Sequence, residues 1–141
     1  MTQTTISLPE VDEVKITTIV DNSIDLLMAG TEVAHRHQLG PNPFERSQPV
    51  AEHGFSVLIT VKRQGKQGAV LFDTGLSQKG FLHNLDALEI NTTGIQAIVL
   101  SHGHPDHAMG LLGVFDRLGK RRLPLVLHPD AYLERKLVLP D

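Results

Sequence analysis

The chain has 141 residues, of which 40% are hydrophobic and 21% charged, with a formal net charge of -3. This apolar fraction is too high for a disordered chain, no stretch approaches the roughly 18 apolar residues of a membrane span, and there is no basic surplus for nucleic acid. Cysteine is absent, which excludes a disulfide framework, a cysteine nucleophile and thiolate metal sites. The first ten residues lack the basic and apolar regions of a secretory signal, so we expect a cytoplasmic location.

Runs of apolar and β-branched residues predict five strands. We expect them at residues 14–20, 55–63, 69–73, 97–100 and 123–128. The second and third strands are joined by QGKQG at 64–68, which predicts a β-hairpin. The fourth strand is wholly apolar, as is typical of a strand covered on both faces.

Apolar residues at helical spacing predict the helices between these strands. We expect one or two turns at 23–30, and helices at 80–89 after the N-cap Ser77, at 108–118 before Gly119, and at 129–136. The polar, proline-containing residues 31–52 are expected to form a long loop, either a lid or substrate loop or a mobile segment. This order predicts an α/β fold with helices packed on a sheet, in one domain at 14–141 after a polar lead-in at 1–13.

The most specific motif is SHGHPDHAMG at 101–110, directly after the expected strand 97–100. It contains four possible metal ligands in the pattern H-x-H-x-D-H: His102, His104, Asp106 and His107. Imidazole and carboxylate groups bind Zn²⁺, Mn²⁺ or Fe²⁺ when thiolates are absent. The two histidines of the turn can chelate one ion, and the adjacent Asp-His pair suits a second ion nearby. The alternative is a histidine-rich surface loop.

These residues resemble a known family. VLSHGHPDHAMGL at 99–111 resembles the signature of the metallo-β-lactamase superfamily of metal-dependent hydrolases, and LFDTGLS at 71–77 resembles its second motif. VDN at 20–22 and EHGFSVLI at 52–59 resemble the branch of dihydropterin-type aminobenzene-phosphate synthases, which is linked to methanopterin-like pterin biosynthesis. The resemblance implies a four-layer αβ/βα sandwich, of which this chain would be the N-terminal half, incomplete at its C-terminus.

The resemblance also implies roles for individual residues. His102 and His104 would bind a first divalent ion, and Asp106 and His107 a second, with zinc expected and manganese or iron as alternatives. Asp73 would lie beside the ions and orient a ligand or the attacking water. Asp106 and Asp73 are therefore the expected catalytic residues, and the substrate is expected to be a small molecule. Superfamily members take further ligands from a second half of the fold, so we expect a homodimer or a complementing C-terminal half.

Two alternatives to a metal-dependent hydrolase stay open. A non-catalytic fragment would have the same motifs without the activity. A retroviral-type aspartic protease would use Asp73, because residues 71–75 match the apolar-apolar-Asp-Thr-Gly triplet of that class. Four further histidines are expected at the surface or in a loop: His35, His37, His83 and His128. Of these, His128 could also stand near the ions. For His53, a position that reaches the pocket and ordinary packing are both open.

Overall fold

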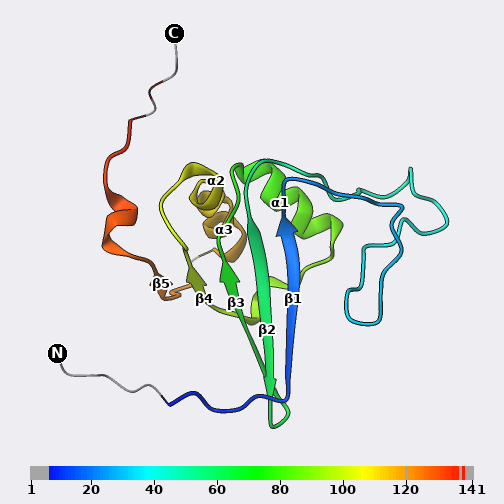
Figure 1. Ribbon diagram of the computed structural model, residues 1–141, viewed down its shortest axis with the longest axis horizontal. Helices are drawn as coiled ribbons and strands as arrows, with labels where there is room; N and C mark the ends of the chain where they lie inside the picture. Colours follow the sequence, from blue (N-terminus) through cyan, green and yellow to red (C-terminus); the bar gives the residue numbers. More distant parts are fainter. Residues whose placement is uncertain (1–6, 120, 137, 139–141) are drawn as a thin grey trace.

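The protein folds around a five-stranded mixed sheet whose strands lie in chain order, β1-β2-β3-β4-β5. The computed structural model describes residues 7–119, 121–136 and 138, so parts of the expected lead-in and of the far end of the expected domain lie outside the described residues. The strands are β1 (Glu13–Val20), β2 (Ser56–Arg63), β3 (Lys66–Phe72), β4 (Ile95–Val99) and β5 (Leu125–Val126). Strand β2 is antiparallel to both β1 and β3, whereas β3 is parallel to β4 and β4 is parallel to β5 (Figure 1).

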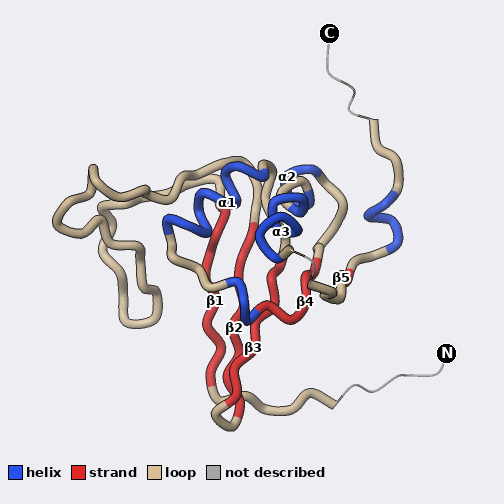
Figure 2. The backbone as a smooth tube through the Cα atoms, turned by 180° about the vertical axis from the view of Figure 1, so that it is seen from behind, coloured by secondary structure: helices blue, strands red, loops and turns tan. Residues whose placement is uncertain are grey.

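Helices cover one face of this sheet. They are α1 (Gln78–Ala87), α2 (Pro105–Ala108) and α3 (Leu111–Leu118), with short 3₁₀ turns η1 (Thr92–Gly94) and η2 (Pro129–Tyr132). Helices α1 and α3 contact each other and α1 contacts β1, and Figure 2 shows both in front of the strands. Helix α2 lies at the end of the sheet where β3 and β4 finish (Figure 1). The expected α/β fold is therefore confirmed.

The core lies between the sheet and these two helices. Alternate residues of the strands supply one half of it, among them Ile19, Leu58, Leu71 and Ile98, and the helices supply Phe81, Leu85 and Val114. All of these side chains are buried. Apolar burial on one face is what holds amphipathic helices on a sheet, because isolated helices of this length are marginal in water.

A buried asparagine joins helix α1 to the start of the sheet. Asn84 donates from Nδ2 to the carbonyls of Ile19 (2.7 Å) and Val50 (2.9 Å), and its Oδ1 accepts from the Val50 N–H (2.8 Å). A buried amide with all these partners costs little, whereas an unpaired one would be destabilising. Helix α1 is thereby fixed against both β1 and the chain segment that leads into β2.

The opposite face of the sheet is apolar and carries no helix within the described residues. The strand register places Ile16, Ile59 and Val70 in one row across it, and Val57, Phe72 and Val99 in the next. Ile16, on the outer strand, is 65% exposed. The accessible surface of the chain is 10709 Å², against roughly 7,200 Å² for a compact monomer of 15.5 kDa.

The helix expected at 23–30 is absent, and that prediction is wrong. The segment forms bends, in which the Asp25 carboxylate accepts from the N–H groups of Leu27 (2.9 Å) and Met28 (3.1 Å). Such a side chain offers the backbone an alternative to helical hydrogen bonds. Leu27 is 86% exposed, so this side chain adds no burial that would stabilise a short helix.

The end of the described chain also differs from expectation. The helix predicted at 129–136 is only the 3₁₀ turn η2, and its Tyr132 is exposed rather than packed on a layer. The strand predicted at 123–128 shortens to β5, because Pro124 has no N–H to donate to a ladder. The helix predicted at 108–118 is divided into α2 and α3 around Gly110.

The long loop is confirmed as a stretch without helix or strand, which spans residues 21–55 and includes the expected 31–52. It projects beside β1 as an extended arm (Figure 1). Whether it acts as a lid stays a prediction. In the described part of the chain, no helix is long and apolar enough to cross a membrane.

Candidate functional site

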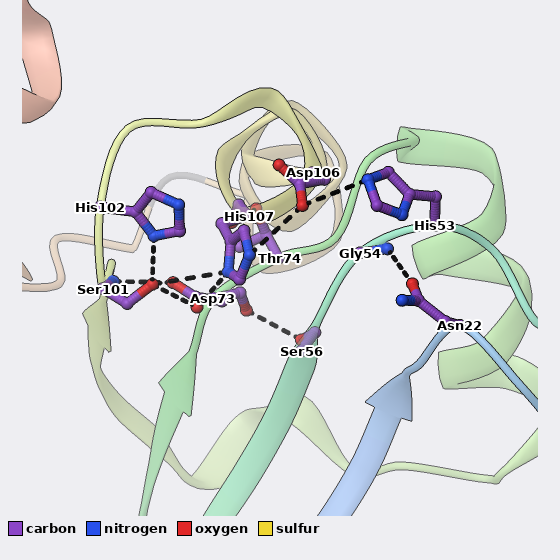
Figure 3. Close-up of polar contacts among 10 residues, drawn as sticks. All are labelled: Asn22, His53, Gly54, Ser56, Asp73, Thr74, Ser101, His102, Asp106 and His107. Atoms are coloured by element: carbon purple, nitrogen blue, oxygen red, sulfur yellow. Dashed lines mark hydrogen bonds and ion pairs between the residues drawn. The ribbon is translucent and has the colours of Figure 1, made fainter.

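The H-x-H-x-D-H residues gather where the parallel strands β3 and β4 end. Asp73 follows β3 and Ser101 comes shortly after β4, and the Asp73 N–H donates to the Val99 carbonyl (2.8 Å). Asp73 has a φ of 55°, a left-handed conformation in which Asp is among the better tolerated residues. This turn directs the Asp73 side chain towards the loop after β4 (Figure 3).

The Asp73 carboxylate is fully buried, and both of its oxygens accept hydrogen bonds. Its Oδ1 accepts from the Ser101 N–H (2.7 Å), and its Oδ2 faces both the Ser101 hydroxyl and His107 Nδ1, each at 2.7 Å. Its backbone carbonyl accepts from the buried Ser56 hydroxyl (2.8 Å). A buried carboxylate needs such donors, because an unpaired charge would be strongly destabilising.

These contacts fix how two imidazoles carry their protons. Because the carboxylate is an acceptor, His107 donates to it from Nδ1–H, which leaves the Nε2 lone pair free. The Ser101 hydroxyl has one hydrogen and gives it to Asp73, so its oxygen accepts from Nδ1–H of His102 (2.9 Å). His102 therefore also keeps a free Nε2 lone pair. Metal-binding histidines have this state, in which one ring nitrogen donates to a carboxylate or its relay and the other binds the ion.

The motif's side chains lie close together. The ring centroids of His102 and His104 are 4.6 Å apart, and those of His102 and His107 are 4.2 Å apart. Helix α2 begins after the N-cap His104 with Pro105 in its first turn, which places Asp106 and His107 on the side of Asp73. The four predicted ligands thus belong to one cluster.

The backbone of α2 is anchored to the segment after β3. The His107 carbonyl accepts from the Thr74 N–H (2.8 Å) and hydroxyl (3.1 Å), and the Gly110 N–H donates to the Gly75 carbonyl (3.2 Å). A Cβ on Gly110 would lie 1.9 Å from the Thr74 carbonyl oxygen. Only glycine allows this approach. The LFDTG segment therefore positions the second half of the ligand motif.

The donor set suits a divalent ion. Asp106 Oδ2 and His107 Nε2 are 3.4 Å apart, which is about the edge of a tetrahedron with zinc–ligand bonds of roughly 2.0–2.2 Å. Within the described residues, however, no group of three or more His, Cys, Asp or Glu side chains is arranged to hold a metal ion. The assignment of His102, His104, Asp106 and His107 as ligands stays a prediction.

His53 lies at the edge of the cluster. Its Nε2 is 3.5 Å from Asp106 Oδ2, and its side chain is 71% exposed. Sequence reasoning left this residue undecided, because a separation of more than fifty positions hides its approach to Asp106. The signal that could have found it is the EHG motif itself.

The other histidines lie outside the cluster. His37 and His83 contact the loop residue Gln48, through its side chain (3.0 Å) and its carbonyl (2.7 Å) respectively. His83 is half-buried, so the expectation that it is exposed is wrong. His128 faces Asp130 at 3.6 Å, and His35 is exposed in the loop.

The family model of the metallo-beta-lactamase superfamily matches residues 50–137, which include β2, the Asp73 turn and the whole ligand motif. The chain belongs to this superfamily. The resemblance to this superfamily drawn from the two sequence motifs is therefore confirmed, and the matched region contains the site described above.

Two proteins of Methanocaldococcus jannaschii are similar to this superfamily member. One is 7,8-dihydropterin-6-methyl-4-(beta-D-ribofuranosyl)-aminobenzene-5'-phosphate synthase, 38% identical over 82 residues, which cover 58% of this chain and 28% of the synthase. The other, uncharacterised, is 36% identical over 88 residues, which cover 60% of this chain and 31% of that protein. The matched part thus spans about three tenths of each relative.

Among solved structures, a metallo-beta-lactamase of Cronobacter sakazakii with a HARLDQ motif is 28% identical, with a TM-score of 0.38 over 51% of this chain and 32% of that one.

The aspartic-protease alternative is wrong. A protease of that class activates a water molecule with a pair of carboxylates that reach the cleft. The Asp73 carboxylate is instead fully buried and bonded to Ser101 and His107.

Proposed function

We propose that this protein is a metal-dependent hydrolase that holds divalent ions through His102, His104, Asp106 and His107. Zinc is the first choice, with manganese or iron as alternatives, because the donors are imidazole and carboxylate. The observation that supports this most is the Asp73 network, which leaves the Nε2 lone pairs of His102 and His107 free. If the motif were only a histidine-rich surface loop, its imidazole rings would not need a buried carboxylate to select their tautomers.

Each side chain has a distinct part in this proposal. Bound divalent ions act as Lewis acids and lower the pKa of water, which supplies a nucleophile at neutral pH. His102 and His104 would bind one ion, and Asp106 and His107 the other. Asp73 would not touch the substrate; it would hold His107 directly, and His102 through Ser101, in the orientation that binds metal.

The substrate is proposed to be a small molecule, and a pterin-related one is the first to test. The support is the similarity to the dihydropterin synthase of Methanocaldococcus jannaschii, which extends over 58% of this chain. Because the matched part is 28% of that relative, the relative's activity is a hypothesis for this chain. A cytoplasmic location also stays a prediction.

We further propose that the open apolar face of the sheet packs on another layer, from a second copy of the chain or from a complementing C-terminal half. Apolar patches larger than a few hundred Å² mark interaction surfaces. The cluster also lacks a third converging donor among the described residues, whereas catalytic zinc usually has three protein ligands. The isolated chain is therefore expected to be dimeric or prone to aggregate, with little hydrolase activity.

Zinc stoichiometry together with light scattering tests both proposals. The wild type is compared with His102→Ala and with His128→Ala, whose histidine lies outside the cluster. Metal binding that is lost in His102→Ala and kept in His128→Ala supports the metal site, and no binding in the wild type favours a non-catalytic fragment. A monomer that binds two zinc ions tightly and hydrolyses an ester or phosphoester would refute the need for another layer.

A further inference from the structure

The VDN and EHG motifs, to which no role has yet been assigned, are joined to each other by hydrogen bonds. The Gly54 N–H donates to Asn22 Oδ1 (2.8 Å), and the Glu52 N–H donates to the Asp21 carbonyl (3.2 Å). Asn22 follows β1 and Gly54 precedes β2, so the motifs close the two ends of the long arm. The segment that contains His53 is thereby fixed at its base.

The same segment rests on the backbone of α2. The Phe55 N–H donates to the Asp106 carbonyl (3.2 Å), and Gly54 has a φ of 140°. A Cβ on Gly54 would lie 2.4 Å from that carbonyl oxygen, so neither the conformation nor the space admits another residue. This close approach places His53 beside the Asp106 side chain.

The position of His53 is difficult to explain by packing. Its side chain is 71% exposed, and its Nε2 faces Asp106 Oδ2 at 3.5 Å. His107 Nε2 faces the same oxygen at 3.4 Å. Figure 3 shows the two imidazoles on opposite sides of the Asp106 carboxylate. Because His107 carries its proton on Nδ1, its Nε2 cannot donate to this oxygen, and only His53 can do so, from Nε2–H. The His53 contact therefore restricts the rotation of the carboxylate, which matters if Asp106 must bind an ion.

We infer that His53 is a positioning residue that holds the Asp106 carboxylate, and that Asn22 fixes the loop from which His53 projects. The arrangement parallels the contact between Asp73 and His107. In the adjacent Asp106-His107 pair, His53 would hold Asp106 as Asp73 holds His107. This inference rests on the proposed function, because it takes Asp106 as a metal ligand. His53 itself is taken as a partner of Asp106 and not as a ligand, and the Asp106→Asn background in the test below separates these two roles.

The test uses the full chain and two readouts. The first is zinc affinity by competition with a chelating dye, and the second is the ¹³Cγ chemical shift of Asp106 in metal-free protein, assigned with Asp106→Asn. The variants are His53→Ala, His53→Gln, Asn22→Ala and Asn22→Asp. His128→Ala is the matched control, because that side chain is also 71% exposed and faces a carboxylate at 3.6 Å.

His53→Ala should weaken zinc binding by about 10-fold, the lower end of the effect of removing a ligand's partner, and should move the Asp106 resonance. His53→Gln and Asn22→Asp, which keep a donor and an acceptor respectively, should recover part of both effects, while Asn22→Ala should not. In the Asp106→Asn background, His53→Ala should have no further effect on zinc affinity. His128→Ala should change neither readout.

An Asp106 resonance that does not respond to His53→Ala overturns the inference, whatever the zinc affinity. So does an equal zinc loss in the Asp106→Asn background, which would mean that His53 binds the ion itself. If the wild type binds no zinc but the Asp106 resonance responds, the contact stands, the proposed function fails, and the metal role of His53 fails with it.

Discussion

Replacing Asp73 by Asn tests the tautomer argument, because it changes one atom of the buried carboxylate and little of its volume. The Ser101 N–H is a fixed donor to Oδ1, so the amide oxygen should take that position. The new NH₂ group then faces the Ser101 hydroxyl and His107 Nδ1. Both can respond: the hydroxyl can rotate, and the imidazole can move its proton from Nδ1 to Nε2.

The expected magnitude follows from these contacts. If both groups adapt, no buried donor is left unpaired, and the free energy of unfolding falls by less than the roughly 1–3 kcal/mol of an unsatisfied buried group. His107 would then carry its proton on Nε2, where it cannot bind metal, and zinc affinity should fall by roughly 10–100-fold. Asp73→Asn should therefore impair metal binding more than folding.

Three measurements check this prediction: urea unfolding, zinc competition and the ¹⁵N shifts of the His107 ring, which distinguish the two tautomers. Ser56→Ala is the control. It removes a buried hydrogen bond to the Asp73 carbonyl (2.8 Å) and leaves the carboxylate unchanged, so it should lower stability by about 1 kcal/mol and keep zinc affinity. Unaltered zinc affinity in Asp73→Asn, or a His107 ring still protonated at Nδ1, would refute the reasoning.

Three further predictions concern the elements around the site. Gly110→Ala places a Cβ 1.9 Å from the Thr74 carbonyl oxygen and should lower stability in urea by about 1–3 kcal/mol, whereas Gly94→Ala, which meets open space, should be tolerated. Ser77→Ala removes the acceptor of the Gly80 N–H (2.9 Å) and should cost about 1 kcal/mol in thermal unfolding; an unchanged midpoint would argue against the cap. The hydrogen bond from Arg117 lowers the pKa of Asp86 below its usual 3.8, so the stability contributed by this pair is present above that pH and lost as the pH falls through the lowered value. The difference in unfolding midpoint between wild type and Asp86→Asn should therefore shrink on acidification, and a difference independent of pH would count against the ion pair.

The site's framework could be predicted because its signals are local. The hairpin, the strand before the motif and the N-cap Ser77 follow from alternation and from residue types within a few positions. The Asp73 role follows from a motif rather than from spacing, since its contact with His107 joins residues 34 positions apart.

The missed features depend on contacts that sequence periodicity does not contain. The segments 23–30 and 129–136 have helical spacing, but Leu27 in the first and Tyr132 in the second stay exposed, and without burial a short helix is marginal. The approach of His53 to Asp106 depends on the φ of Gly54 and on a backbone contact across the fold. Backbone conformation at a single glycine is not encoded in an apolar pattern.

The open sheet face and the extended arm have a consequence for how the protein unfolds. An unfolded chain of 15.5 kDa exposes roughly 22,500 Å². Because the native chain already exposes 10709 Å², unfolding uncovers about three quarters of the area that a compact domain of this mass would uncover. The denaturant m-value and the heat-capacity change both scale with that area. A shallow urea transition in the isolated chain would thus reflect an expanded native surface rather than lost cooperativity, and covering the open face should steepen it.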